Sequence, residues 1–211
     1  MHASRPGTKG TRVVEVFIVG INGSPNRAGN TFSLVDAAMS RCKEMGARTE
    51  ILQVMDALEG QDEPYCVACA TPCPETCHQN PNLADAYDLL RDCDGLIVGS
   101  PVYFGIVSGQ LKSFWDKSRN LRGEKALVGK PAAALAVGAG RFGGQETTVR
   151  AIHDMLLVHG MCIVGDASRA SGAGHQGVCA QRPADEDTAA LERARVAAEG
   201  IVEVLQASGA A

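Results

Sequence analysis

The chain alternates apolar runs with amphipathic helical segments along most of its length, and this alternation limits the possible folds more than any other feature. Apolar runs rich in β-branched residues are typical of strands buried on both faces, and such strands need helices above and below the sheet. The runs lie within residues 13–24, 49–56, 95–101, 131–140 and 161–167, and the helical segments within 30–47, 83–93, 108–120, 145–160 and 185–206. The pattern predicts an α/β fold with a doubly wound, five-stranded parallel sheet, right-handed crossovers and helices on both faces.

Size and composition agree with one domain of this kind. The chain has 211 residues, of which 45% are hydrophobic, and a net charge of −4, with no basic block that would suggest nucleic acid or an anionic membrane as a partner. The first residues are positively charged but are not followed by an apolar segment, and no apolar run approaches the roughly 18 residues that a membrane span needs. We expect a disordered tail at 1–12, one domain at 13–207 and a cytoplasmic protein.

Ligands of a doubly wound sheet bind beyond the carboxyl ends of the strands, where the strand order reverses. For the order 2-1-3-4-5, this point lies between the first and third strands. The loops at 22–31, 101–107 and 139–145 should therefore meet around the ligand.

The first of these loops, NGSPNRAGNT, carries Ser24, Asn26, Asn30 and Thr31 between a strand and a helix. Short hydroxyl and amide side chains, free amides of the first helical turn and the positive end of the helix dipole together form an anion cradle. The loop has neither the P-loop nor the G-x-G-x-x-G pattern, which disfavours ATP and the usual mode of dinucleotide binding. A capped turn without any ligand is the alternative interpretation.

The other two loops suggest a planar ligand. SPVYFGIVSGQLK places Tyr103 and Phe104 after a buried strand, where they could stack on an isoalloxazine ring; alternatively, both rings pack beneath the next helix near Trp115. GAGRFGGQE, residues 138–146, allows close backbone approach through its glycines, and Arg141 or the following helix could stabilise negative charge on a reduced flavin. The coincidence of three such loops at one sheet edge favours a bound ligand.

Four cysteines lie close together in an insertion at 62–82, after the second strand, with the spacing C-x-x-C-x-x-x-C-x-x-x-C. In a reducing compartment such a group indicates a metal site or a redox device rather than a disulfide framework. Cys66, Cys69, Cys73 and Cys77 could converge on one [4Fe-4S] cluster, on a structural zinc ion with His78 as a possible substitute ligand, or remain free or disulfide-forming thiols. A solvated loop position is the alternative for His78. We expect the remaining cysteines, Cys42, Cys93, Cys162 and Cys179, to be inert, the first three as small buried hydrophobic residues.

The segments GSPNRAGNT, DGLIVGSPVYFGIVSGQLKSFWD and GRFGGQE, together with the cysteine-rich insertion, resemble the flavodoxin-fold NAD(P)H-dependent FMN reductases and, within that group, the iron–sulfur flavoproteins. The resemblance covers residues 13–167. It implies FMN, a [4Fe-4S] cluster on the four cysteines and assembly into a homodimer or homotetramer. The family commonly has two residues between the second and third cysteines and a longer final gap, a pattern from which this chain departs. The residues implied at the flavin are Ser24, Asn26, Asn30 and Thr31 for the phosphate and ribityl chain, Pro101, Val102, Tyr103, Phe104 and Gly105 along the ring, and Arg141, Gly143 and Gly144 closing over it.

The sequence thus predicts an FMN-dependent oxidoreductase that passes electrons between NAD(P)H or reduced ferredoxin and a small acceptor. No catalytic side chain is needed, because hydride and electron transfer are the chemistry of the cofactors. His153 and His159 fall on a helix or at its end and are expected to be structural. The alternatives are an NAD(P)H-dependent FMN or quinone reductase without a cluster, and a non-enzymatic electron carrier with protein partners.

Overall fold

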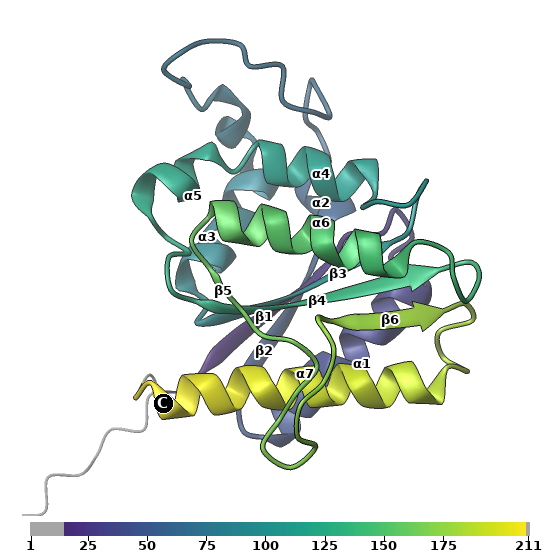
Figure 1. Ribbon diagram of the computed structural model, residues 1–211. Helices are drawn as coiled ribbons and strands as arrows, with labels where there is room; N and C mark the ends of the chain where they lie inside the picture. The colour runs from purple at the N-terminus through teal and green to yellow at the C-terminus, as the bar shows by residue number, and fades with distance from the viewer. Residues whose placement is uncertain (1–14, 210–211) are drawn as a thin grey trace, which may run out of the picture.

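The computed structural model describes residues 15–209, so the tail expected at 1–12 and the first two residues of segment 13–24 lie outside the described residues. A twisted parallel sheet with the strand order β2-β1-β3-β4-β5 forms the centre of the fold (Figure 1). This is the order expected for a flavodoxin-like sheet. The strands are β1 (Phe17–Asn22), β2 (Arg48–Gln53), β3 (Gly95–Pro101), β4 (Pro131–Gly138), β5 (Cys162–Ile163) and β6 (Val178–Gln181).

The central strands are buried on both faces, as their apolar runs predict. Every residue of β1 and β4 is buried, whereas in β2, at the edge of the sheet, Leu52 is buried and the other residues are exposed or partly exposed. Consecutive residues of β3 contribute to different cores, since Ile97 packs on one side of the sheet and Val98 on the other. A Cβ atom at Gly99 would overlap Val35, so this glycine allows the first helix to lie close against the sheet.

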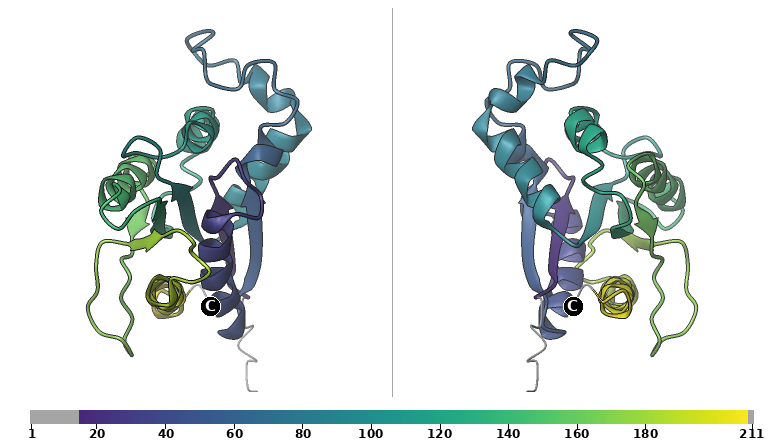
Figure 2. Two further views of the ribbon diagram at one scale, coloured as in Figure 1. Left: turned by 90° about the vertical axis from the view of Figure 1, so that its right-hand side faces the viewer. Right: turned by 90° about the vertical axis from the view of Figure 1, so that its left-hand side faces the viewer.

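Helices cover both faces of the sheet (Figures 1 and 2). One face packs against α1 (Asn30–Glu44) and α7 (Thr188–Ala207), and the other against α3 (Pro81–Asp92), α4 (Gly109–Asp116) and α6 (Gln145–Val158). Figure 2 shows these helices nearly end-on, with α4 and α6 on one side of the sheet and α7 on the other. Within residues 15–209, no helix combines the length and apolar character that a membrane crossing requires.

The fifth strand position differs from the expectation of one strand at 161–167. Only β5 pairs with the beginning of β4, and the chain then leaves the sheet and returns as β6, which pairs with the second half of β4. In an uninterrupted strand Asp166 would be opposite Leu135, but Val178 occupies that place twelve residues later. The buried carboxylate of Asp166 instead accepts hydrogen bonds from the backbone of His175 and, at 2.6 Å, from Arg193 of α7. These contacts hold the excursion at 164–177 outside the sheet.

Helix 108–120 also differs, because it is interrupted. It ends as α4 at Asp116, and α5 (Arg119–Glu124) follows after Lys117 and Ser118. The hydroxyl of Ser118 donates to the carbonyl of Trp115 at 2.6 Å and satisfies one of the free carbonyls at the end of α4. The expected strand 49–56 likewise ends at Gln53, where the short helix α2 (Val54–Ala57) begins, and the 3-10 turn η1 (Thr76–Gln79) closes the cysteine-rich insertion.

Candidate functional site

Two buried serines fasten the first two predicted loops to each other at the carboxyl edge of the sheet. Ser108, the N-cap of α4, donates its hydroxyl to the carbonyl of Gly23 at 2.5 Å. Its backbone nitrogen donates to the hydroxyl of Ser100 at 3.0 Å, and that hydroxyl in turn donates to the carbonyl of Pro101 at 2.8 Å. The sequence gives no signal for this role, because serine before a helix reads only as a cap.

The first loop is ordered by its own side chains. The hydroxyl of Ser24 accepts from the backbone of Asn26 at 3.0 Å, and the side chain of Asn26 accepts from the backbone of Ala28 at 3.1 Å. No side chain caps the first turn of α1, whose N-cap is Gly29. The amides of that turn are therefore available to an anionic group, such as the phosphate of FMN.

Asn30 and Thr31 lie at this same helix start but make different contacts. The side-chain oxygen of Asn30 accepts from the backbone of Ala184 at 2.7 Å, which ties the loop to the segment before α7. Thr31 is buried, and its methyl group lies against Gly99 of β3. Asn30 thus has a structural role that the sequence did not suggest.

The second loop is a tight hairpin that presents aromatic rings to solvent. Tyr103 and Ile106 exchange backbone hydrogen bonds of 2.9 and 3.2 Å, and the two residues between them, Phe104 and Gly105, have φ values of 50° and 81°. This combination is characteristic of a type I′ turn. Tyr103 is 45% exposed and Phe104 fully exposed. The alternative in which both rings pack near Trp115 is therefore wrong.

The third loop is held against the hairpin by α6. Thr147 donates to the carbonyl of Gly105 at 2.6 Å. Gly144 has a φ of 95°, and a Cβ there would lie 2.9 Å from the Cα of Gly105. Gln145, which the sequence analysis did not single out, accepts from the backbone of Gly143 at 2.9 Å and donates to the carbonyl of Gly140 at 2.7 Å. This buried glutamine fixes the shape of the glycine-rich loop.

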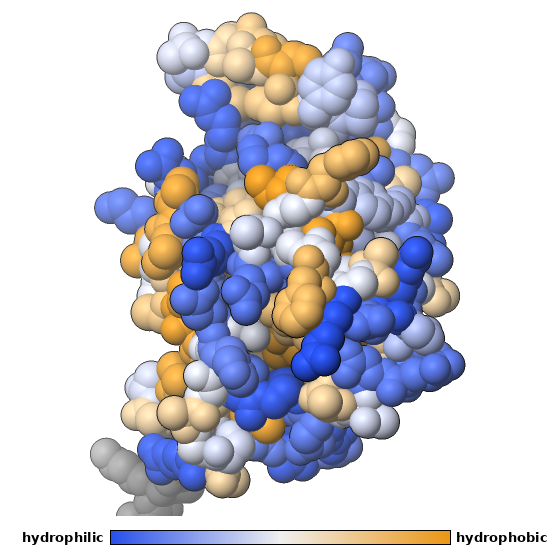
Figure 3. Space-filling model, turned by 45° about the vertical axis from the view of Figure 1, so that its right-hand side comes forward, coloured by the Kyte–Doolittle hydropathy of each residue, from blue (hydrophilic) through white to orange (hydrophobic). Residues whose placement is uncertain are grey.

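Exposed apolar side chains surround these loops. Phe142, in the third loop, is 93% exposed, and the guanidinium carbon of Arg141 lies 5.6 Å from the centre of its ring. Figure 3 shows apolar side chains standing among polar ones on this side of the molecule. The exposed rings of Phe104 and Phe142 offer large planar surfaces to a ligand or a partner at the carboxyl edge of the sheet.

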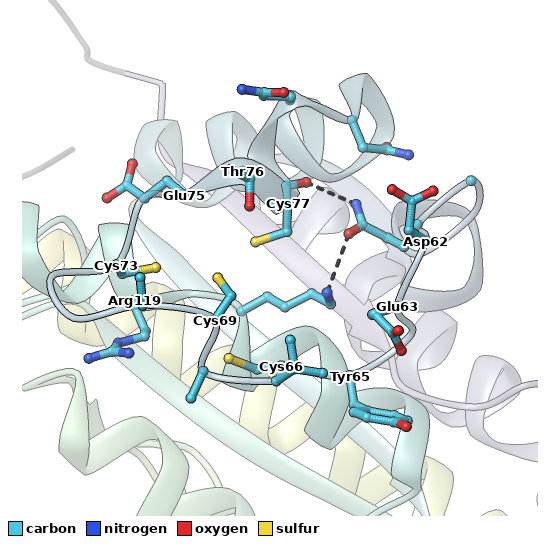
Figure 4. A pocket seen from close by; sticks show the side chains of 18 residues that line it. Asp62, Glu63, Tyr65, Cys66, Cys69, Cys73, Glu75, Thr76, Cys77 and Arg119 are labelled. Carbon is cyan, nitrogen blue, oxygen red and sulfur yellow. Dashed lines mark hydrogen bonds between the residues drawn. The ribbon is translucent and has the colours of Figure 1, made fainter.

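The cysteine-rich insertion forms a separate cavity of about 460 Å³. Cys66, Cys69, Cys73 and Cys77 all line it, and their sulfur atoms point toward a common centre (Figure 4). Cys66 and Cys69 are exposed, whereas Cys73 and Cys77 are partly buried. The four thiols are thus brought together, as a shared ligand site requires.

Two hydrogen bonds attach this insertion to the break between α4 and α5, and a third joins its two ends. Gln61 donates to the carbonyl of Cys77 at 3.0 Å and accepts from the ammonium group of Lys117 at 3.3 Å. The ring nitrogen Nε2 of His78 lies 2.8 Å from the carbonyl of Lys117, and the ring packs edge-on against Tyr87. His78 is therefore an anchor of the insertion, and its assignment as a solvated loop residue is wrong.

A buried ammonium group, that of Lys117, lies beside the four thiols of the cavity. Among residues 15–209, no three histidine, cysteine, aspartate or glutamate side chains are arranged to hold one metal ion. Burial raises the pKa of the Cys77 thiol, and the nearby charge of Lys117 partly opposes this effect. A buried ammonium group beside four cysteines fits a ligand set that is negatively charged when metal is bound.

Helix α4 joins the two regions. Its N-cap, Ser108, contacts the first loop, residues 22–31, and its C-cap, Lys117, lines the cysteine cavity. Its eight residues correspond to about 12 Å of helix. The carboxyl edge of the sheet and the cysteine cavity thus lie at opposite ends of α4.

The remaining cysteines and histidines are mostly structural. Cys42 and Cys93 are buried, as expected, and burial raises the pKa of each thiol to about 12. Cys162 is exposed on β5, so its assignment as a buried residue is wrong. His159 is buried beside Trp115, at 3.0 Å from the hydroxyl of Ser118, and burial lowers its pKa. The thiol of Cys179 is on an exposed residue of β6, and partial burial raises its pKa to about 11.

Comparison with known proteins identifies the family. A sequence model described as NADPH-dependent FMN reductase matches residues 16–176. The chain belongs to this family. It is 40% identical over 194 residues to an iron–sulfur flavoprotein of Methanocaldococcus jannaschii, covering 90% of this chain and 97% of the relative. An iron–sulfur flavoprotein of Methanosarcina thermophila is 36% identical over 191 residues, covering 90% and 95%.

The structural comparison agrees on the fold. A flavodoxin, WrbA-like protein from Agrobacterium tumefaciens superposes with a TM-score of 0.62 at 18% identity, covering 92% of this chain and 98% of that one. Family and fold together make the chain an FMN-dependent oxidoreductase of the flavodoxin-like type.

Proposed function

We propose that this FMN-dependent oxidoreductase carries a [4Fe-4S] cluster on Cys66, Cys69, Cys73 and Cys77, and that it passes electrons between NAD(P)H or reduced ferredoxin and a small acceptor. The observation that carries the proposal is the single cavity lined by all four cysteines. The two relatives that align with 90% of the chain are both named iron–sulfur flavoproteins, and this supports the proposal. By the same resemblance, the protein assembles as a homodimer or homotetramer.

The flavin site is proposed at the carboxyl edge of the sheet. The uncapped first turn of α1, with Ser24, Asn26, Asn30 and Thr31 around it, would bind the phosphate and ribityl chain. The hairpin at 101–105 would lie along the ring, and Arg141, Gly143 and Gly144 would close over it. The serine bridge between the first two loops and the Thr147 contact between the last two support this assignment, because together they hold all three loops at one place.

The protein's own contribution is positional. A flavin supplies two-electron chemistry and an iron–sulfur cluster one-electron chemistry. The three loops would orient the flavin beside the exposed ring of Phe104, while the insertion gathers four thiols at the other end of α4. No side-chain acid or base is required for electron transfer itself.

An NAD(P)H-dependent FMN or quinone reductase without a cluster is the second candidate. It is favoured by the description of the matching family and by the exposure of Cys66 and Cys69, which lie at a loop surface rather than in a closed core. In that case the insertion holds zinc or free thiols.

The test is the visible spectrum of protein purified without oxygen, with iron, sulfide and zinc assayed on the same sample before and after exposure to air. The proposal expects flavin bands on a broad, bleachable shoulder and about four irons per chain. Flavin bands without iron, or with one zinc per chain, would replace it with the second candidate. Turnover with NADH or NADPH and a quinone, measured on the same sample, separates an enzyme from an electron carrier, which would be reduced only stoichiometrically.

A further inference from the structure

Lys117 is a buried lysine without a carboxylate partner. It is only 5% exposed, and its ammonium group has one hydrogen-bond acceptor, the side-chain oxygen of Gln61 at 3.3 Å. Among the ion pairs formed by residues 15–209, none includes Lys117. Lysines are almost never buried unless an opposite charge compensates the loss of hydration. The neighbouring Lys112 shows the ordinary arrangement, since it is exposed and pairs with Asp116 at 2.6 Å.

The position of Lys117 is fixed from both ends of the cysteine-rich insertion. Gln61 lies at the start of the insertion, and its side-chain oxygen accepts a hydrogen bond from the ammonium group. His78 directly follows the last cysteine, and its ring contacts the backbone carbonyl of the same lysine. The interruption between α4 and α5 places Lys117 at this point as the C-cap of α4. An ordinary surface lysine would not be held by both ends of a metal-binding loop.

Among the described residues, the groups that can carry negative charge in the cavity lined by Lys117 are the four cysteines and the carboxylates of Asp62, Glu63 and Glu75. The three carboxylates are exposed, so solvent and salt screen them, and none forms an ion pair with Lys117. The other cation along the cavity wall, Arg119 (Figure 4), is exposed, so solvent and salt screen it. A cluster with four cysteinate ligands carries net negative charge and would compensate the buried ammonium group.

We propose that Lys117 is the charge partner of the cluster and raises its reduction potential. This inference rests on the proposed function, since it requires a cluster on the four cysteines. One-electron reduction adds one negative charge to the cluster, with the electron supplied by the donor. A fixed positive charge in surroundings of low dielectric constant stabilises this reduced form more than the oxidised form. Lys117 is therefore a positioning and tuning residue, and it takes no part in bond making.

The test compares wild type with K117M, K117R and K112M, all purified without oxygen. Iron and sulfide per chain, bound FMN and the midpoint potential of the cluster, followed by electron paramagnetic resonance during titration with dithionite, are measured for each protein. K117M should lower the midpoint potential of the cluster by at least 59 mV. For a one-electron couple, this shift is a tenfold fall in the ratio of reduced to oxidised cluster at a given solution potential. K117R should stay close to wild type, and K112M, which loses an exposed charge on the same helix, should not differ from it.

Each outcome distinguishes the inference from the function on which it rests. Equal potentials in K117M and K112M, with the cluster present in both, overturn the inference and leave the proposed function standing. Loss of iron from K117M alone, with FMN retained, supports it, because the charge is then needed for assembly. Equal loss of iron from K117R and K117M, with FMN retained, overturns it, because shape rather than charge would matter. Wild type without iron overturns the proposed function itself.

Discussion

The flavin loops and the cysteine-rich insertion are built on opposite principles, although α4 connects them. The loops proposed to bind the flavin emerge from buried strands and are fixed by backbone hydrogen bonds, buried serines and tightly packed glycines such as Gly23 and Gly144. The insertion is largely exposed and is attached to the fold mainly through Gln61, His78 and the stem of α3. The first site is therefore formed by the sheet itself, whereas the second, under the proposed function, would depend on a bound metal to become rigid.

The largest difference between the two regions should appear when one metal ligand is removed. Cys69→Ser should abolish the cluster, because an exposed loop has no other means of holding four irons. FMN content and the free energy of unfolding of the metal-free protein should remain unchanged. Iron, sulfide and FMN assays on protein purified without oxygen measure this separation. Cys162→Ser, which removes an exposed thiol from β5, is the control and should retain all its iron; full iron in Cys69→Ser would remove that cysteine from the ligand set.

The converse experiment is directed at the flavin edge. Gly144→Ala places a methyl group 2.9 Å from the Cα of Gly105 at a φ of 95°, and should cost about 2 to 4 kcal/mol of stability through strain and overlap. It should weaken FMN binding at least tenfold, because the third loop moves away from the hairpin, and should leave the iron content unchanged.

A glycine in open space provides the matched control for this substitution. Gly46 has a φ of 89° and no neighbour within 4 Å, so Gly46→Ala should cost only the strain of about 1 to 2 kcal/mol. FMN titration by fluorescence and urea unfolding measure both variants. Equal losses of stability in the two would mean that the third loop is not tightly packed against the hairpin.

A smaller effect is expected where the insertion is attached to the fold. Gln61→Ala removes two hydrogen bonds, each worth about 1 kcal/mol, and should release iron to a chelator several times faster than wild type. FMN binding should not change. Gln79→Ala serves as the control because Gln79 lines the same cavity but is exposed and forms no side-chain hydrogen bond with the described residues. Identical release rates in the two variants would show that the attachment does not stabilise the cluster.

The smallest effect on stability is expected at the hairpin tip. Phe104→Ala should change the free energy of unfolding by less than about 0.5 kcal/mol, since the ring is fully exposed, yet reduce FMN affinity a few-fold if the ring lies along the flavin. The buried Phe114 gives the contrast, because Phe114→Ala should cost about 3 to 5 kcal/mol. Unchanged FMN affinity in Phe104→Ala would leave the ring free for a protein partner or a second subunit.

The sequence predicts the parts of the fold that depend on burial. The apolar runs around Val19, Ile97 and Ala134 have no stable place other than the centre of a parallel sheet, and the loops after them must share one edge. β6 could not be predicted, because four residues within a glycine-rich segment become a strand only when β4 offers them a free edge.

The contacts between distant segments were also outside the reach of sequence patterns. Asn30 reads as a cap or phosphate ligand, and nothing local indicates that its side chain will bind the backbone of Ala184. Lys117 follows a helical pattern next to an aspartate and resembles any solvated lysine. Its burial follows from the interruption after α4 and from an insertion whose position depends on tertiary contacts.

The excursion between β5 and β6 has a practical consequence for protein engineering. Because β4 pairs separately with the segments before and after it, the length of the excursion has no influence on the alignment of any other strand. Residues 170–173, which are exposed, could be replaced by a longer linker, a peptide tag or a pair of new chain ends. The contact between Asp166 and Arg193 and the hydrogen bond from Ser168 to Glu199 would be kept. The fold therefore contains a natural attachment point on the far side of the molecule from the cysteine-rich insertion (Figure 1).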